Sequence, residues 1–243
     1  MDKRPIAFFD SGIGGSTILK EVINTLPNEN YIYYPDSKNN PYGNKTKEEL
    51  FSIVDNIVQE LLKYNPKLIV CACNTATTMV LKDIREKYKD IIFIGTEPAI
   101  KVAYDFYRDK KTIILTTKGT GDSDRFNDLL EKYKVSNFNL IEAPLLAGFI
   151  EKNEDCSDYL NNLLGVYKDT EVVVLGCTHF PIVKDEIKNV LGDVTFIDGS
   201  IGIAKRIDSI LKEKNMYNNS YKLDIINTDE EIRNRILNII KAR

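Results

Sequence analysis

The sequence predicts an α/β protein of two similar doubly wound domains, whose parallel-rich sheets face each other across a cleft. Three observations favour this fold class. Short β-branched and aromatic runs alternate with segments that have the period of a helix. Several of these runs are apolar throughout, which is typical of strands covered by helices on both faces. Polar turns and a cysteine recur at matching strand ends in the two halves of the chain.

Eight runs have the composition of strands. Leu68-Ile69-Val70 and Val172-Val173-Val174-Leu175 are apolar at every position, which indicates burial on both faces. The expected strands are Ile6–Phe9, Tyr31–Tyr34, Leu68–Val70, Ile91–Ile94, Thr112–Leu115, Asn139–Ile141, Glu171–Leu175 and Val194–Ile197. Their alternation with helical segments is the order of a parallel α/β fold.

The clearest helix begins after residue 45. Thr46 and Glu49 have the spacing of a capping box, which satisfies free backbone N–H groups at a helix start. Apolar residues follow at helical spacing on one face: Leu50, Ile53, Val54, Ile57, Val58, Leu61 and Leu62. We expect this face to pack in the core and to have no catalytic role.

The recurring strand ends indicate an internal repeat. One strand of the first half ends at Asp10 and a later one ends at Cys73, while Thr117 and Cys177 follow strands of the second half. Chance remains an alternative, because every doubly wound sheet has polar turns at its strand ends. Ligands of such sheets bind beyond the carboxyl ends of the strands, so these residues fall on the functional edges.

The repeat predicts two domains. The first comprises residues 1–94 plus about 207–243 and carries Asp10 and Cys73. The second comprises residues 95–206 and carries Thr120, Cys177 and His179. A chain of 243 residues that is 43% hydrophobic has enough apolar residues for either one large core or two modest ones.

Charge and hydropathy exclude two classes of partner. The net charge is −3, and the 33 basic and 36 acidic residues are mixed along the chain, so no basic stripe is available for nucleic acid. No stretch approaches the ~20 apolar residues that span a bilayer. We therefore expect a soluble, cytoplasmic protein with no nucleic-acid or membrane partner.

The four cysteines are Cys71, Cys73, Cys156 and Cys177, which are too few and too scattered for a disulfide framework. Free thiols are expected. Cys71 and Cys73 are closer together than zinc-ligand pairs usually are, and His179 is the single histidine. We expect no metal site.

The glycine-rich segment Gly12-Ile13-Gly14-Gly15 follows a strand, and Asp36 follows the next one, as in a dinucleotide-binding loop. The match is poor, because Thr17 stands where the third glycine belongs and Asp10 brings a negative charge to the phosphate position. Glycines that permit a tight turn are the simpler explanation. Asp10 is then either a helix cap or a partner for an ammonium group or a thiol.

Two of the cysteines have features of catalytic groups. Cys73 and Cys177 each come between an apolar strand and an expected helix start, where backbone dipoles lower a thiol's pKa and make it a usable base. A buried cysteine is more often a small hydrophobe, which is the interpretation for Cys71 and Cys156. His179 is either a surface or capped residue or, being close to Cys177, a group that holds a proton near neutral pH.

Taken together, five segments resemble the glutamate racemases of the aspartate/glutamate racemase superfamily, in the family's order and up to about Gly202. They are Phe9-Asp10-Ser11-Gly12-Ile13-Gly14-Gly15, Asn40-Pro41-Tyr42-Gly43, Cys71-Ala72-Cys73-Asn74-Thr75-Ala76-Thr77, Gly95-Thr96-Glu97-Pro98 and Leu175-Gly176-Cys177-Thr178-His179-Phe180-Pro181. Each motif is weak alone, and their combination is highly specific.

The resemblance implies an isomerase that binds glutamate between two α/β domains and interconverts its L and D forms. It implies no pyridoxal phosphate, no other cofactor and no metal. It assigns Cys73 and Cys177 as acid/base catalysts, with Asp10 supporting the first and His179, with Glu151, the second. It implies that the substrate-binding residues are Asp10, Ser11, Pro41, Tyr42, Gly43, Cys73, Asn74, Thr75, Thr117, Thr120, Cys177, Thr178 and His179. It also implies a homodimer and a supply of D-glutamate for peptidoglycan synthesis.

The chain departs from the family pattern at three places. Gly121 stands where an aliphatic residue is usual, Ala143-Pro144-Leu145 replaces Cys-Pro-Leu, and Asp198-Gly199-Ser200 replaces Asp-Ser-Gly. None of these is a catalyst, but Gly121 leaves the shape of the pocket open.

Two other functions remain alternatives. Some superfamily members, racemases of other small acids or decarboxylases, keep a single cysteine, and the presence of both cysteines argues against them. A protein that binds an amino acid without reacting it would show no exchange of the α-proton with solvent.

Overall fold

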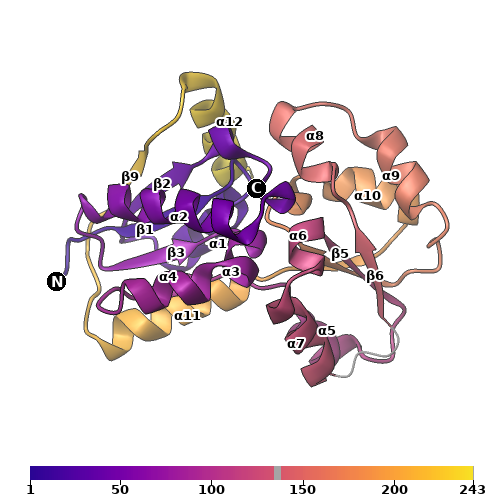
Figure 1. Cartoon of the computed structure of the whole chain (residues 1–243), viewed down its shortest axis with the longest axis horizontal. Coiled ribbons are helices and arrows are strands. Elements are labelled where there is room, and N and C mark those ends of the chain that lie inside the picture. The colour runs from indigo at the N-terminus through magenta and orange to yellow at the C-terminus, as the bar shows by residue number, and fades with distance from the viewer. Residues whose placement is uncertain (134–137, 243) are drawn as a thin grey trace.

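The computed structural model describes residues 1–133 and 138–242, which form two sheets with helices packed around them (Figure 1). The first sheet has the strand order β4-β3-β1-β2-β9 and the second has the order β6-β5-β7-β8. Each neighbouring pair of strands is parallel. The strands are β1 (Ile6–Asp10), β2 (Asn30–Pro35), β3 (Leu68–Cys71), β4 (Phe93–Gly95), β5 (Thr112–Thr116), β6 (Phe138–Glu142), β7 (Val172–Gly176), β8 (Thr195–Ile197) and β9 (Lys222–Ile225).

The two sheets repeat one topology. In the first sheet β1 lies between β2 and β3, and β4 is next to β3. In the second sheet β5 lies between β6 and β7, and β8 is next to β7. The predicted fold class, two similar doubly wound units with parallel sheets, is confirmed. The eight expected strands are present, with bounds within two residues of those expected.

The strand β9 was not expected from the sequence. It pairs with β2 at the edge of the first sheet, where a strand has one neighbour. Lys222 is exposed there and Asp224 is half-buried. A four-residue run with two charges lacks the apolar signal of the central strands, so the edge strand resembled a loop.

The helices form the layers on both sides of the sheets. Those of the first half are α1 (Ser16–Thr25), α2 (Lys47–Leu62), α3 (Asn74–Met79), α4 (Leu81–Lys87), α11 (Ser200–Glu213) and α12 (Glu230–Lys241), with the 3-10 turns η1 (Ser37–Asn39) and η2 (Tyr42–Asn44). Those of the second half are α5 (Ile100–Tyr107), α6 (Lys118–Gly121), α7 (Asp124–Tyr133), α8 (Leu146–Lys152), α9 (Ser157–Leu164) and α10 (Lys184–Leu191), with the turn η3 (Phe180–Val183).

The alternation of side chains along β1 divides the first half into two cores. Phe9 faces the cluster formed with α2 and α4, whereas Phe8 faces the cluster formed with α1 and α11. The predicted capping box of α2 is present, with Thr46 accepting from the Glu49 N–H and Glu49 accepting from the Thr46 N–H. Its apolar face lies in the core as expected, which explains that face without any catalytic role.

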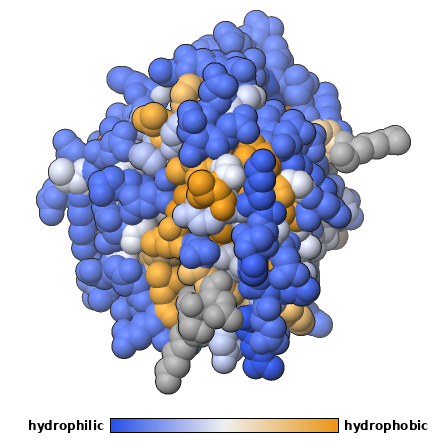
Figure 2. Space-filling view, turned by 90° about the vertical axis from the view of Figure 1, so that its right-hand side faces the viewer, coloured by the Kyte–Doolittle hydropathy of each residue, from blue (hydrophilic) through white to orange (hydrophobic). Residues whose placement is uncertain are grey.

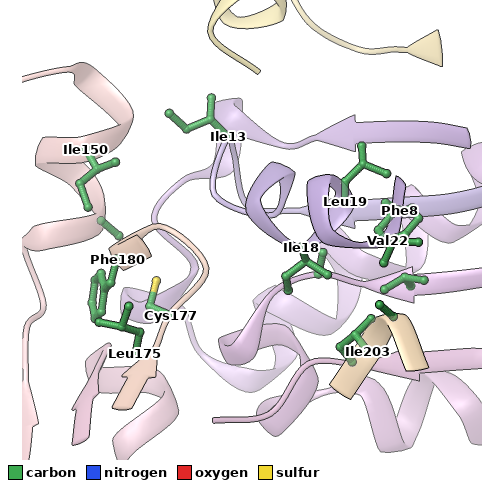
Figure 3. Packing of buried hydrophobic residues seen from close by; sticks show 14 of the residues in the cluster. Phe8, Ile13, Ile18, Leu19, Val22, Ile150, Leu175, Cys177, Phe180 and Ile203 are labelled. Atoms are coloured by element: carbon green, nitrogen blue, oxygen red, sulfur yellow. The ribbon is translucent and has the colours of Figure 1, made fainter. Parts of the chain in front are cut away.

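One hydrophobic core continues from the first half into the second. It joins α1 and α11 to β5, β7, α8 and α10, and Figure 3 shows members from both sides, among them Ile18 and Ile203 on one side and Ile150 and Phe180 on the other. The opposite face of the second sheet packs against α5 and α7. The halves are therefore joined by buried apolar contacts as well as by the polypeptide chain.

The chain crosses between the sheets twice, after β4 and before α11. The predicted second domain boundary near residue 207 falls inside α11, which packs against α1 of the first half. The division into residues 1–94 plus about 207–243 and residues 95–206 stays a prediction.

Figure 2 views the end of the molecule formed by the second half, where apolar side chains gather in a band among hydrophilic ones. Exposed large apolar residues of this half are Val102, Phe106, Leu140, Leu145 and Val166. Within the described ranges, no helix combines the length and the apolar composition needed to cross a membrane.

Candidate active site

The two candidate catalytic cysteines occupy equivalent positions in the two sheets. Cys73 follows β3 and forms the N-cap of α3, and Cys177 follows β7, two residues before the His179 N-cap of η3. Both are buried, with exposed fractions of 4% and 7%. The charge on Cys177 is close enough to contribute to the pKa of Cys73. The structure thus brings both thiols to the edges at which parallel sheets bind ligands.

Cys177 is linked to a histidine and a carboxylate. His179 Nδ1 lies 3.9 Å from Cys177 Sγ, and His179 Nε2 lies 2.8 Å from Glu151 Oε2. Burial alone lowers the pKa of His179, but the hydrogen bonds with Cys177 and Glu151 outweigh it and raise this pKa well above its usual value. His179 is therefore a buried cation or a strong base beside the thiol.

The Glu151 carboxylate receives further hydrogen bonds from the other half of the molecule. The Ile13 N–H donates to Oε2 at 3.0 Å, and the Ser37 hydroxyl donates to Oε1 at 2.5 Å. Burial opposes ionisation, but the hydrogen bonds from His179, Ser37 and the Ile13 N–H, together with the charge of His179, outweigh it and lower the pKa of Glu151. Sequence reasoning did not find Ser37, and no motif there indicated that it would reach Glu151.

The glycine-rich segment makes room for these groups. A Cβ on Gly12 would lie 2.2 Å from Glu151 Oε2, and a Cβ on Gly14 would lie 2.3 Å from His179 Nδ1. Both distances are far below van der Waals contact. The glycines thus allow the strand-to-helix turn of the first half to approach Glu151 and His179 of the second half closely.

Asp10 is fully buried at the end of β1. Its carboxylate accepts from the Gly15 N–H at 2.8 Å and from the Thr178 hydroxyl at 3.4 Å. Burial raises the pKa of Asp10, although His179 and the Gly15 N–H counteract it. Asp10 therefore connects the first half to the segment that carries Cys177.

The pKa of Cys73 differs from the sequence expectation. A lowered pKa was predicted from the helix start, but burial raises the pKa of this thiol well above its usual value and the Asp10 carboxylate raises it further. The Ala76 N–H in the first turn of α3 acts in the opposite direction and is outweighed. The prediction of a lowered pKa is wrong for Cys73 in this closed site, because removal from water costs more than the helix start supplies.

Three threonines meet where the halves touch. Thr75 Oγ1 of α3 lies 2.9 Å from Thr117 Oγ1 and 3.3 Å from Thr120 Oγ1, and Thr117 is the N-cap of α6. All three are buried. They form a hydroxyl cluster across the cleft. All three belong to the predicted substrate-binding residues, which come from both halves.

The segment that contains the cis Asn40–Pro41 bond covers the first half of the site. Asn40 donates to the Ser11 carbonyl at 3.2 Å, and the buried Tyr42 hydroxyl donates to Asp36 at 2.7 Å. Gly43 approaches Thr117 of the second half so closely that an added Cβ would lie 3.2 Å from the Thr117 Cβ. Gly43 is thus held close to the hydroxyl cluster, and Tyr42 before it is fixed by its hydrogen bond to Asp36.

Two polar atoms beside a small cavity lack a protein partner. Among the described residues, the buried Asn74 Oδ1 and Thr96 Oγ1 make no hydrogen bond, and both residues line this cavity with Cys177 and Thr178. Its volume of about 10 Å³ is close to the minimum for one water molecule. Figure 3 shows Cys177 beside Leu175 and Phe180 of the second half, on the side that faces the first.

The remaining cysteines lie in the core. Cys71 is fully buried, and burial raises its pKa to about 12, while Cys156 is 3% exposed. The four cysteines, which all lie in the described part of the chain, are free thiols. Within that part, no group of three or more His, Cys, Asp or Glu side chains is arranged to hold a metal ion.

Comparison with known proteins identifies the family of the chain. Residues 29–205 match the Asp/Glu/Hydantoin racemase family. The chain belongs to this racemase family. A glutamate racemase of Clostridium perfringens is 43% identical over 238 residues, which cover 93% of this chain and 92% of that protein.

Solved structures of racemases of this family have the same fold. The glutamate racemase of Escherichia coli, in complex with L-glutamate and the activator UDP-MurNAc-Ala, is 28% identical with a TM-score of 0.85, covering 98% of this chain and 95% of that one. The glutamate racemase of Francisella tularensis, in complex with D-glutamate, is 27% identical with a TM-score of 0.82, covering 100% and 96%.

The departures from the racemase pattern lie outside the cysteine pair. A Cβ on Gly121 would lie 2.9 Å from Glu142 Oε1 and 3.3 Å from Thr116 Oγ1. The space beside Gly121 is therefore bounded by side chains of β5 and β6. Asp198 accepts from the Ser200 N–H at 3.0 Å at the start of α11, which gives that segment a capping role.

Proposed function

We propose that the chain interconverts L- and D-glutamate without a cofactor, using Cys73 and Cys177 as two acid/base groups on opposite faces of the substrate. The observation that carries the proposal is the pair of buried thiols at equivalent strand ends of two facing sheets, each with its own polar support. Membership of the racemase family supports the reaction class. The names of the similar glutamate racemases support the substrate.

The chemistry requires one group on each face of Cα. One thiolate removes the α-proton and becomes a thiol, while the thiol on the other face gives its proton to the carbanion and becomes a thiolate. The two cysteines therefore exchange protonation states in each turnover, and the reverse reaction starts from the state that the forward reaction leaves.

The supports of the two thiols differ in charge. Asp10 lies on the Cys73 side and His179, held by Glu151, lies on the Cys177 side. A histidine cation stabilises a thiolate at Cys177, whereas a carboxylate disfavours a thiolate at Cys73. We propose that, because the supports differ, their loss affects the two reaction directions unequally in the proton-abstraction step.

The negative charge of the intermediate needs stabilisation in a site that excludes water. Backbone N–H groups in the turns that lead into α3 and η3 and the hydroxyls of Thr75, Thr117 and Thr120 are suited to the α-carboxylate and its growing charge. Asn74 Oδ1, which lacks a partner among the described residues, is suited to the ammonium group. Ser11, Pro41, Tyr42, Gly43 and Thr178 complete the proposed pocket.

The burial of both thiols supports a conformational step. Cys73 and Cys177 are 4% and 7% exposed, so substrate entry and product release require the halves to separate. We further propose that the enzyme acts in the cytoplasm as a homodimer and supplies D-glutamate for peptidoglycan, cell-wall synthesis and cell shape. These assignments follow the resemblance and family membership.

The test is an exchange assay in deuterated water. We expect either enantiomer of glutamate to be interconverted without added cofactor, and Cα of the product enantiomer to acquire solvent deuterium. Retention of the original proton in nearly all of the product would exclude two bases that exchange with water. Binding of glutamate without exchange would indicate a binding protein, and exchange with retention in the wild type would favour a one-base enzyme.

A further inference from the structure

The carboxylate that supports Cys177 is held mainly by the opposite half of the molecule. Glu151 belongs to α8 of the second half, together with its partner His179 on the segment after β7. Its two other donors, the Ile13 N–H and the Ser37 hydroxyl, belong to the first half. Gly12 of the first half leaves no space for a Cβ against this carboxylate.

A second contact from the first half reaches the same residue. Arg235 of α12 donates to the carbonyl oxygens of Glu151 and Ile150, the latter at 2.7 Å. These carbonyls lie at the C-terminal end of α8, where a cation is favourable. Figure 1 shows α12 on the side of the first half that is turned toward α8, and Figure 3 shows Ile13 on the side that faces Ile150.

We propose that Ser37 and Arg235 are positioning residues that complete the acid/base support of Cys177 when the two halves close. Closure brings the Ser37 hydroxyl and the Ile13 N–H to the Glu151 carboxylate, while Arg235 fixes the end of the helix that carries it. The inference rests on the proposed function, because it concerns the same thiol.

The physical consequence of opening follows from these contacts. When the halves separate, Glu151 loses two of the three hydrogen bonds that its carboxylate makes within the described part of the chain. Loss of these donors raises the pKa of the Glu151 carboxyl and leaves the carboxylate less well oriented toward His179. His179 then stabilises a Cys177 thiolate less. Closure around the substrate thus completes the support of Cys177, which is the base in one reaction direction.

The variants Ser37→Ala, Ser37→Thr and Arg235→Met test this inference. Two matched controls change the same residue types away from Glu151. Ser52→Ala removes a hydroxyl that bonds to the Glu48 carbonyl on the exposed side of α2, and Arg233→Met removes a guanidinium of α12 that bonds to the Ile225 carbonyl inside the first half.

Steady-state kinetics provide the first measurement. We expect Ser37→Ala and Arg235→Met to lower kcat roughly tenfold, the effect of losing one hydrogen bond to a charged group, with little change in KM. Ser37→Thr should restore most of the loss, and the controls should resemble the wild type. A rise in KM with unchanged kcat would overturn the proposal, because it would mean that these residues only hold the cleft shut.

The primary deuterium isotope effect provides a readout that distinguishes the two directions. The enantiomer deprotonated by Cys177 is the one whose α-proton the Cys73→Ala variant still exchanges. With α-deuterated substrate, the isotope effect on kcat of Ser37→Ala should rise for that enantiomer and stay near the wild-type value for the other. Equal changes for both enantiomers would contradict a role that acts through Cys177.

Alkylation by iodoacetamide, followed by peptide mass spectrometry, needs no turnover. We expect Cys177 to react several-fold more slowly in Ser37→Ala than in the wild type and at the wild-type rate in Ser37→Thr, because less of it is thiolate. An unchanged or faster reaction would overturn the proposal. A wild type that does not interconvert glutamate would end the proposed function alone, and alkylation would still decide whether the first half controls Cys177.

Discussion

The two thiols differ in their surroundings at the scale of single residues. Cys73 has a raised pKa because it is buried and lies near Asp10, whereas Cys177 has the His179 ring at 3.9 Å. Cys71 is equally buried, but its thiol donates to the Cys73 carbonyl at 3.6 Å and it is the last residue of β3. Position in the turn beyond an equivalent strand, rather than burial, separates the catalytic candidates from the core cysteines.

Replacement of single cysteines should reveal this division. We expect Cys73→Ala and Cys177→Ala each to abolish racemisation, since one remaining base removes a proton but leaves the opposite face without a donor. Each variant should still exchange the α-proton of one enantiomer slowly, with retention, and the two should prefer opposite enantiomers. The measurement is racemase activity and exchange by purified, folded variants in both directions.

Cys71→Ala and Cys156→Ala are the matched controls and should keep most of the activity. Asp10→Asn and His179→Asn should weaken catalysis by less than loss of a thiol, within the roughly 10²–10⁴-fold range of general acid–base catalysis. Substantial turnover by either catalytic cysteine variant would rule out the two-thiol mechanism.

At the scale of elements, the turn between β1 and α1 serves the packing of the two halves. Its glycines were expected to allow a tight turn, and the dinucleotide alternative was disfavoured by Asp10 and Thr17. Their further effect is close approach, because Gly12 and Gly14 face Glu151 and His179 of the other half. No local feature of the glycine pattern distinguishes a tight turn from a surface on which another domain packs.

Substitution of these glycines should impair catalysis before it impairs folding. In Gly12→Ala the new Cβ overlaps the end of the flexible Glu151 side chain, which can move aside, so we expect roughly a hundredfold loss of kcat with little change in Tm. Gly14→Ala should be worse, because its Cβ would also lie 2.7 Å from the His179 backbone nitrogen. Gly202→Ala, where an added Cβ meets nothing within 4 Å, is the control.

Activity and thermal unfolding of these three variants are the measurements. Wild-type activity in Gly12→Ala would show that the position of the Glu151 carboxylate does not matter for turnover. Equal losses in Gly202→Ala would indicate a general sensitivity of the fold to added methyl groups.

At the scale of the whole molecule, four sets of contacts hold the two halves together around the buried site. The hydroxyl cluster, the Asp10–Thr178 bond, the Glu151 contacts and the shared core all connect the two halves. A substrate that fits between them must reach partners on both sides while its Cα lies between the thiols. The length of the substrate is therefore a criterion by which the enzyme selects it.

Aspartate should be a poor substrate for this reason. It is one methylene shorter than glutamate, so it cannot keep both carboxylates on their partners with Cα correctly placed, and displacements of about 1 Å can cost around a hundredfold in rate. Racemisation of the two acids under identical conditions, compared as kcat/KM, is the measurement. Comparable values would remove glutamate specificity from the proposed function.

Much of the fold could be predicted from the sequence because its strongest patterns are local. Buried parallel strands are apolar runs, so eight strands were found, and the capping box of α2 marks its own helix start. The edge strand β9 was missed because one side of it has no neighbouring strand, and its charged residues remain in contact with water.

The sequence by itself determined the two α/β units, the strand ends that carry Cys73 and Cys177, and the family resemblance. The tertiary structure decided which groups surround these thiols. Ser37 and Arg235 reach Glu151 from positions far along the chain, and burial reverses the pKa shift expected for Cys73. The physical reason is that periodicity reports which face of an element is buried, whereas contacts across the cleft and loss of solvent depend on how two separately formed sheets pack together.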